Sequence, residues 1–169
     1  MALAFIGLGS NLGDGRANLR EAWKRLGATQ GITVLGLSSP YETAPVGMES
    51  AHWFTNAVGA LDTGLGPTEL LAVLLAVERS LGRDRAKGQD RTVDLDLLFY
   101  DDLILNTPEL VLPHPEIPGR LFVLTPLEEL APDHLHPLSG RTIRQLRRER
   151  NQSGQEIRKS NWQGSSDQP

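Results

Sequence analysis

Apolar runs bounded by glycine, proline and polar residues alternate along the chain with longer segments of helical periodicity. The run at residues 2–8 ends at Gly9 and indicates a buried strand. Similar runs predict strands at residues 32–37, 54–61 and 92–100, followed by a short strand at 103–105. Residues 38–53 contain two prolines and a glycine, which predict a loop long enough to be functional.

Three segments carry helix signals. Asp14 is a candidate N-cap for a helix over about residues 16–30, with Trp23 on the face that packs against the core. Pro67 is suited to the first turn of a second helix, whose strongly apolar part covers residues 70–81. A short basic helix is expected near residues 142–150.

The order of the main elements is β-α-β-β-α-β, which predicts a ferredoxin-like α+β fold with an antiparallel sheet. Helices are expected to pack on the sheet, with the two long ones covering the same face. The length suits one domain, which we assign to residues 1–150. Residues 151–169 are rich in Gln, Ser, Asn and Gly, so we expect a poorly ordered polar C-terminal extension.

Composition narrows the function classes. Of the 169 residues, 39% are hydrophobic and 22% charged, as is usual for a globular protein with a real core. The chain has no cysteine, which excludes a disulfide framework and fits a reducing cytoplasm. We find neither a signal peptide nor a membrane span, and therefore expect a cytoplasmic protein. A net charge of −4 argues against a general nucleic-acid binder.

Two carboxylates interrupt the apolar strand "RTVDLDLLFY". Side chains at i and i+2 of a strand share a face, so Asp94 and Asp96 project together while Leu95 and Leu97 point to the core. Adjacent acids repel one another unless a cation lies between them, and Mg²⁺ is often held by one or two carboxylates. A pair of exposed acids on an edge strand is the plain alternative, which this motif alone does not exclude.

Basic residues flank this strand. The segment "GRDRAKGQDR" precedes it with Arg83, Arg85, Lys87 and Arg91, and "PHPEIPGR" follows it with His114 and Arg120. A site for a nucleoside triphosphate needs acids that hold a metal cation, together with several basic side chains, because the negative charge of the phosphates must be neutralised from several sides. Taken by itself, the first segment is better explained as a solvated charged turn than as a functional loop.

The glycine-rich start "GLGSNLGDG" lies between a strand and a helix, as a dinucleotide-binding fingerprint does. The spacing fails, because Gly7 and Gly9 would require a glycine at the position of Leu12. We therefore interpret these glycines structurally, as a tight turn and a helix entry.

Taken in order, the motifs resemble those of one family, the 6-hydroxymethyl-7,8-dihydropterin pyrophosphokinases of folate biosynthesis. The resemblance covers about residues 3–135 and rests on "GSNLGD", "SSPYETAPVG", "FTNAV", "ELLAVLLAVERSLGR", "RTVDLDLLFY" and "LPHPEIPGRLFVLTPLEELAP". It implies a ferredoxin-like, usually monomeric enzyme. Such an enzyme transfers pyrophosphate from ATP to the hydroxymethyl oxygen of the dihydropterin and releases AMP.

The resemblance also assigns roles to residues. Asp94 and Asp96 match the acids that hold two Mg²⁺ ions between ATP and the pterin hydroxyl. Asn56 matches the amide that reads the pterin edge, since an amide both donates and accepts hydrogen bonds. Phe54 and Phe122 match the aromatics that sandwich the pterin ring. Other matches are the pterin-binding backbone at Thr43 and Val46, the phosphate-binding and catalytic Arg83 and Arg91, the phosphate-binding His114 and Arg120, the basic loop residue Arg85, and the acid Glu78 near the nucleotide.

The chain also departs from the family pattern. Members usually carry Trp-Gly-Pro-Arg or a similar segment before the aspartate strand, whereas "KGQDR" stands here and lacks the aromatic residue. Leu75 replaces a glutamine that often contacts the nucleotide. These changes bear on loop closure and nucleotide affinity, because neither removes a metal ligand.

Several alternatives stay open at this level. Phe54 and Phe122 could be core residues, and His114 could stiffen a proline-flanked turn. His52, His134 and His136 match no family ligand and are expected at the surface. The whole chain could be a relative that binds pterin or nucleotide without activity, or a ferredoxin-like RNA-binding module with exposed aromatics on its sheet.

Overall fold

The computed structural model describes residues 1–44, 53–82, 92–150 and 156–163. The principal elements are the strands β1 (Ala2–Ser10), β2 (Ile32–Leu37), β4 (Phe54–Thr63) and β5 (Asp94–Tyr100), and the helices α1 (Gly15–Gly27) and α2 (Pro67–Ser80). The shorter ones are β3 (Tyr41–Thr43), β6 (Leu105–Asn106), β7 (Val111–Leu112), the 3₁₀ helix η2 (Ile117–Gly119), α3 (Leu121–Leu130), α4 (Ile143–Glu149) and β8 (Ile157–Lys159).

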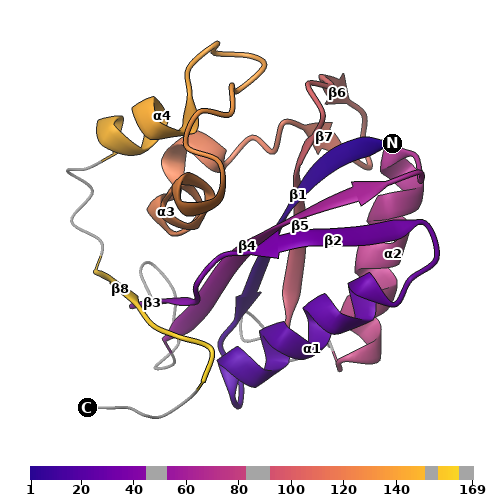
Figure 1. The fold of residues 1–169 in the computed structure, drawn as a ribbon, viewed down its shortest axis with the longest axis vertical. Helices are drawn as coiled ribbons and strands as arrows, with labels where there is room; N and C mark the ends of the chain where they lie inside the picture. Colours follow the sequence, from indigo (N-terminus) through magenta and orange to yellow (C-terminus); the bar gives the residue numbers. More distant parts are fainter. Residues whose placement is uncertain (45–52, 83–91, 151–155, 164–169) are drawn as a thin grey trace.

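The main sheet is antiparallel and runs in the order β5-β1-β4-β3-β8, with β2 also pairing with β4 (Figure 1). β4 is long enough for β3 to pair with its beginning and β2 with its end, on the same side. The two long helices connect β1 to β2 and β4 to β5. The predicted ferredoxin-like β-α-β-β-α-β core is confirmed.

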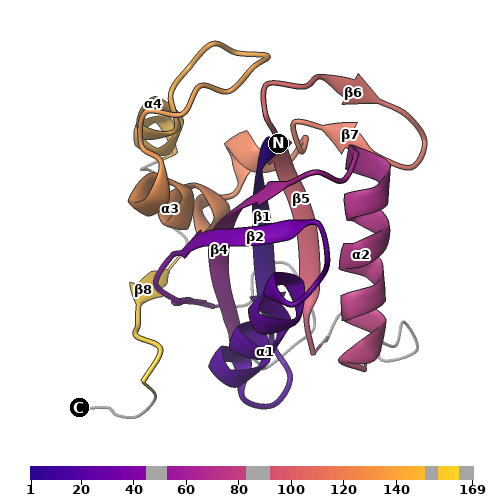
Figure 2. The ribbon, with the colours of Figure 1, turned by 45° about the vertical axis from the view of Figure 1, so that its right-hand side comes forward.

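The sheet lies between two helical layers (Figures 1 and 2). Alternate residues of β1 face opposite sides, so Ala4, Ile6 and Leu8 join one core with α1 and α2. Val58 of β4 and Leu98 of β5 join a second core with α3 and α4. The two long helices share a face as predicted, and α3 and α4 cover part of the opposite face.

Trp23 packs on the face of the sheet that α1 and α2 cover, toward the core as predicted. Its ring lies so close to Gly59 of β4 that a Cβ atom there would come within 2.3 Å of it. Asp14 also caps α1 as predicted, since its Oδ1 accepts a hydrogen bond of 3.2 Å from the backbone N–H of Ala17.

Short elements account for most differences from the sequence-based expectations. The predicted loop at 38–53 contains β3, and the predicted poorly ordered tail contains β8, which pairs with it. The short strand expected at 103–105 lies instead at β6, where it pairs with β7. No element was predicted for the segment that forms α3. Strands of two or three residues carry almost no periodic pattern, so long-range pairing decides where they form.

Two histidines expected at the surface lie in the second core. His136 is buried, and the ring of His134 packs 5.1 Å from that of Phe5 and 4.7 Å from that of Phe99, measured between centroids. His52 lies outside the described residues. The expectation failed because these histidines stand in an irregular segment, where no periodicity marks the buried side.

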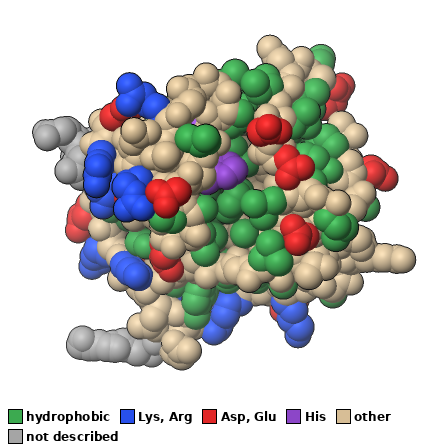
Figure 3. All heavy atoms as spheres, turned by 45° about the horizontal axis from the view of Figure 1, so that its top comes forward, with side chains coloured by type: hydrophobic (Ala, Val, Ile, Leu, Met, Phe, Trp, Pro, Cys, Tyr) green, Lys and Arg blue, Asp and Glu red, His purple; other side chains and the backbone are tan. Residues whose placement is uncertain are grey.

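Basic side chains gather toward one side of the face shown in Figure 3, the side on which α4 lies in Figure 1. Arg144 of α4 pairs with Asp133 at 3.1 Å and Arg147 with Glu128 at 3.1 Å. These carboxylates offset part of the positive charge. Among the residues that the structure describes, no helix has the length and apolar character needed to cross a bilayer.

Candidate functional site

The candidate site lies where β5, β1 and β4 run side by side, on the face that also carries α3. In the strand register, Gly9 of β1 stands between Asp94 of β5 and Asn56 of β4. Gly7 is likewise paired with Asp96. Paired residues of an antiparallel sheet present side chains to the same face, so the side chains of the two acids and of Asn56 lie on one face of the sheet.

The glycines form the floor of that space. A Cβ atom at Gly9 would lie 3.1 Å from Oδ1 of Asn56, closer than ordinary van der Waals contact. Any larger residue would therefore crowd the amide and fill the gap between it and the acids. The turn and helix entry expected of the glycine-rich start are found at Gly13, which has a φ of +68°, and at Gly15, which begins α1. Gly7 and Gly9 belong to neither, because both lie within β1 and line the pocket.

A pocket of about 420 Å³ opens above this floor. Phe54 lines it from β4 and Phe122 from α3, so two aromatic side chains come from different layers of the fold. The remaining lining residues are Gly7, Leu8, Gly9, Thr43, Ala44, Asn56, Ala57, Asp94, Asp96, His114, Arg120 and Val123.

Asn56 is held in place by β3. Its Nδ2 donates a hydrogen bond of 3.1 Å to Oγ1 of Thr43, and both residues are buried. This bond uses one of the two amide hydrogens and fixes the plane of the amide. Among the described residues, no further side-chain hydrogen bond engages the carbonyl oxygen or the second amide hydrogen, so both can face the edge of a flat heterocycle.

Two basic side chains approach Asp96. Nε2 of His114 and Nη1 of Arg120 each lie 4.0 Å from one of its carboxylate oxygens. The guanidinium of Arg120 also lies 5.6 Å from the ring centroid of Phe122 and pairs with Glu116 at 3.8 Å. The pocket therefore has the guanidinium of Arg120 and the imidazole of His114 beside its acids, which suits an anionic ligand.

His114 is held by one hydrogen bond from its backbone and one to its ring. Its backbone N–H donates to the carbonyl of Leu98 at 2.9 Å, and its Nδ1 accepts from the N–H of Glu116 at 3.1 Å. Burial lowers the pKa of His114, and the neighbouring Asp96 carboxylate offsets this only in part. With Nδ1 accepting, the neutral ring carries its proton on Nε2, the atom that faces Asp96.

Most predicted site residues within the described ranges meet in this pocket: Thr43, Phe54, Asn56, Asp94, Asp96, His114, Arg120 and Phe122. Val46, Arg83, Arg85 and Arg91 lie outside the described residues. Glu78 of α2 does not line the pocket, since it is buried and its Oε2 accepts a hydrogen bond of 2.6 Å from the N–H of Leu95. The sequence analysis missed Gly7 and Gly9, for which the i, i+2 spacing in a strand was the available signal.

Asp94 and Asp96 are the acidic side chains of the pocket that could contribute ligands to a magnesium ion. Within the part of the chain that the structure describes, no cluster of three or more His, Cys, Asp or Glu side chains could hold a metal ion. Mg²⁺ is commonly bound by one or two carboxylates, with water and substrate phosphate completing its octahedron. The open floor above Gly7 and Gly9 leaves space for those further ligands.

Comparisons with known proteins match the sequence of this chain to one family. The family model for 7,8-dihydro-6-hydroxymethylpterin-pyrophosphokinase matches residues 5–132. The 2-amino-4-hydroxy-6-hydroxymethyldihydropteridine pyrophosphokinase of Methylorubrum extorquens is 44% identical over 146 residues, covering 86% of this chain and 91% of its own length. The Synechocystis protein of the same name is 44% identical over 144 residues, covering 85% and 73%.

Solved structures support the fold. The Plasmodium falciparum HPPK-DHPS wild type with pteroate superposes with a TM-score of 0.72 at 14% identity, over 90% of this chain. The match covers 46% of the solved chain, so this chain spans less than half of that protein. The RNA-binding alternative gains no support from Phe5 of β1 and Phe99 of β5, because both are buried in the second core with α3 and α4.

Proposed function

The chain belongs to the 7,8-dihydro-6-hydroxymethylpterin-pyrophosphokinase family, and from this premise we propose that it transfers pyrophosphate from ATP to 6-hydroxymethyl-7,8-dihydropterin. The acceptor is the hydroxymethyl oxygen, and the leaving product is AMP. One observation carries the proposal: Asp94, Asp96 and Asn56 face the same pocket across a floor of glycine. This places phosphate chemistry beside a site for a flat heterocycle.

The pterin binds between the two phenylalanines in this proposal. A flat ring gains contact area and stacking energy from Phe54 on the sheet and Phe122 on α3. Asn56 then reads the polar edge of the ring, because Thr43 has already fixed its amide plane. Backbone groups near Thr43 and Val46 complete recognition, and the hydroxymethyl group points toward Asp94 and Asp96.

The ATP phosphates bind on the cationic side. His114 and Arg120 flank Asp96 and offer N–H donors to phosphate oxygens. We assign Arg83, Arg85 and Arg91 to the same task because of the family match. Since Nε2 of His114 carries a proton in the neutral ring, His114 acts as a hydrogen-bond donor and not as a general base. In-line transfer then depends on positioning and charge neutralisation.

We further propose that Asp94 and Asp96 hold two Mg²⁺ ions. When bound, the metal supplies Lewis-acid stabilisation of the phosphates and lowers the pKa of the attacking hydroxyl. The protein contributes a pair of carboxylates on one strand face and the aromatic side chains of Phe54 and Phe122. Glu78 supports this pair through the backbone, so we assign it a structural role behind the nucleotide site. A cytoplasmic monomer is the proposed working state.

Identification of the nucleotide product tests this function. Purified protein is mixed with ATP, Mg²⁺ and 6-hydroxymethyl-7,8-dihydropterin, and AMP should form only when metal and pterin are both present. Asp96→Asn should abolish nearly all turnover, whereas Asp102→Asn, an exposed acid outside the pocket, should retain it. ADP as the product would contradict the proposed bond cleavage. Pterin binding without turnover would favour the inactive-relative alternative and direct attention to "KGQDR".

A further inference from the structure

The C-terminal segment at residues 156–163 lies against the edge of the candidate site although it falls beyond the family-model match, which ends at residue 132. Its strand β8 pairs with β3 in an antiparallel register, with Thr43 opposite Ile157 and Tyr41 opposite Lys159. On its other side β3 pairs with β4, with Thr43 opposite Phe54. A strand of three residues thus gains partners on both edges.

This short strand carries part of the site. Thr43 and Ala44 line the pocket, and Thr43 accepts the hydrogen bond that orients the amide of Asn56. The backbone N–H of Ala44 donates to the carbonyl of Glu156 at 3.4 Å, at the beginning of the C-terminal segment. The position of Thr43 therefore depends on a strand too short to be held by one neighbour alone.

Further contacts tie the segment to two other parts of the fold, the residues just before β3 and the helix α1. Nε1 of Trp162 donates to the carbonyl of Ser38 at 2.9 Å, just before β3. Nη1 of Arg16 in α1 donates to Oγ of Ser160 at 3.2 Å, and Nη1 of Arg20 donates to the carbonyl of Trp162 at 2.7 Å. These anchors fix the segment independently of its strand pairing.

One further contact reaches the residue next to Phe54. The guanidinium of Arg158 lies 4.4 Å from the ring centroid of Trp53. Such a cation–π contact stabilises the neighbouring backbone without touching the pocket itself. The strand β8 thus contacts both β3 and Trp53, the residue that immediately precedes β4.

We propose that residues 156–163 are a positioning element for the pterin site. The segment holds Thr43, and through it Asn56, in the binding geometry before the ligand arrives. Pre-organisation of this kind raises affinity because less conformational entropy is lost on binding. The identity of the ligand rests on the proposed function, whereas the positioning role rests on the contacts of β8.

The strand register supplies a matched pair of variants. Antiparallel residues alternate between hydrogen-bonded and non-bonded pairs. Since Ala44 bonds to Glu156 and Ser160 bonds to Pro40, the pair Glu42–Arg158 is also of the bonded type. Arg158→Pro therefore removes a ladder N–H, whereas Lys159→Pro replaces an N–H that points away from β3. Arg158→Ala removes the contact with Trp53 and keeps the ladder.

The experiment measures binding of 6-hydroxymethyl-7,8-dihydropterin by calorimetry in the full chain, with Mg-ATP titrated separately. Arg158→Pro should weaken pterin binding about tenfold, the effect of one lost hydrogen bond, and should change Mg-ATP binding less than about twofold. Lys159→Pro should bind within about twofold of wild type, and Arg158→Ala should fall between the two. Amide hydrogen exchange of Tyr41–Thr43 should rise only in Arg158→Pro.

Unchanged pterin affinity in Arg158→Pro, with Tyr41–Thr43 deprotected, would overturn the positioning role. If Arg158→Pro does not fold, Arg20→Ala is used in its place, because it removes the hydrogen bond to the carbonyl of Trp162. Unchanged pterin affinity in Arg20→Ala would then overturn the positioning role, and weaker pterin binding with unchanged Mg-ATP binding would support it. A wild-type chain that bound no pterin would overturn the proposed function. In that case the exchange difference between the two proline variants would still test whether β8 holds β3.

Discussion

The carboxylate of Glu78 in α2 accepts a hydrogen bond of 2.6 Å from the backbone N–H of Leu95, the residue between the two pocket aspartates. Glu78 is buried, so this bond forms away from water. Hydrogen bonds to a charged group are stronger than neutral ones, and buried ones are costly to break. The helix thereby fixes the strand whose alternate side chains are Asp94 and Asp96.

Replacing Glu78 should therefore affect both stability and metal binding. Glu78→Ala is expected to lower the free energy of unfolding by about 1–3 kcal/mol, because it leaves a buried N–H without that acceptor. The Mg²⁺ concentration for half-maximal activity should rise as well. Glu78→Gln keeps an acceptor oxygen and should be milder. Glu109→Gln, at an exposed position away from β5, is the control for both assays.

Gly9→Ala should weaken pterin binding. The added methyl would lie 3.1 Å from Oδ1 of Asn56, whose amide cannot turn away without losing its bond to Thr43. We expect the KM for the pterin to rise about tenfold or more, which is a loss of affinity similar to that of one hydrogen bond. The KM for ATP should change little. Gly64→Ala, where a Cβ would meet only Met1 at 3.8 Å, is the matched control. Equal pterin KM values for the two variants would contradict the crowded-floor explanation.

The buried histidines should make the fold sensitive to acid. Burial lowers the pKa of His134, and burial together with the neighbouring His134 lowers that of His136. The unfolded chain then binds more protons than the folded one below the ordinary histidine pKa of about 6.5. Stability should be full above that pH and should decrease as the pH falls below it, by at most about 1.4 kcal/mol per pH unit for each proton.

Urea unfolding between pH 5 and pH 8 measures this dependence. His134→Leu should flatten the curve below pH 6.5, because one titrating group is replaced by an apolar side chain among Phe5 and Phe99. His114 also has a lowered pKa and contributes with the same sign, so some slope should remain. An unchanged slope in His134→Leu would show that this half-buried ring does not govern the acid response.

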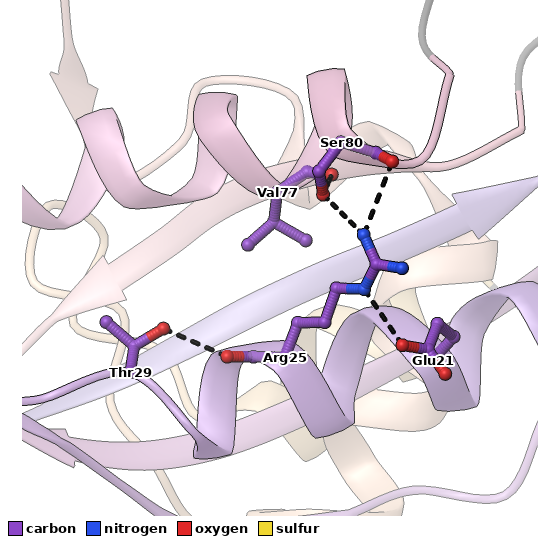
Figure 4. Close-up of polar contacts among 5 residues, drawn as sticks. All are labelled: Glu21, Arg25, Thr29, Val77 and Ser80. Carbon is purple, nitrogen blue, oxygen red and sulfur yellow. Dashed lines mark hydrogen bonds and ion pairs between the residues drawn. The ribbon is translucent and has the colours of Figure 1, made fainter.

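Arg25 joins the two long helices (Figure 4). Its Nη1 donates to Oγ of Ser80 at 2.7 Å and to the carbonyl of Ser80 at 3.3 Å, while its Nε bonds to Glu21 in the same helix. The contact satisfies a carbonyl in the last turn of α2, where helix carbonyls lack partners. Arg25→Met should lower the free energy of unfolding by about 1 kcal/mol through the lost Ser80 contacts.

Thermal and urea unfolding of Arg25→Met, compared with Arg25→Lys, test this contact. Lysine keeps the charge but cannot reach Ser80 and Glu21 with the same planar group, so a partial loss is expected. A variant as stable as wild type would show that the bridge between α1 and α2 is energetically neutral, as exposed ion pairs often are.

The sequence by itself determined the elements that are long enough to carry a period. Alternation in β5 predicted that Asp94 and Asp96 share a face, and the pocket contains both. The four long strands and two long helices were also predicted, because apolar periodicity is a local property of ten or so residues. The ordered motifs singled out residues that the structure, within its described ranges, brings together in one pocket.

Only the tertiary structure decided what depends on partners distant in sequence. β3 and β8 are three residues each and exist as a pair more than 110 residues apart, so no local signal distinguishes them from loop and tail. Gly7 and Gly9 became a pocket floor because their neighbours in the sheet are Asp96, Asp94 and Asn56. His136 is buried because α3 and α4 close over β5, and Glu78 bonds to Leu95 because α2 packs beside it. Strand pairing and helix packing join residues across the chain, and that information is not present in any short window of sequence.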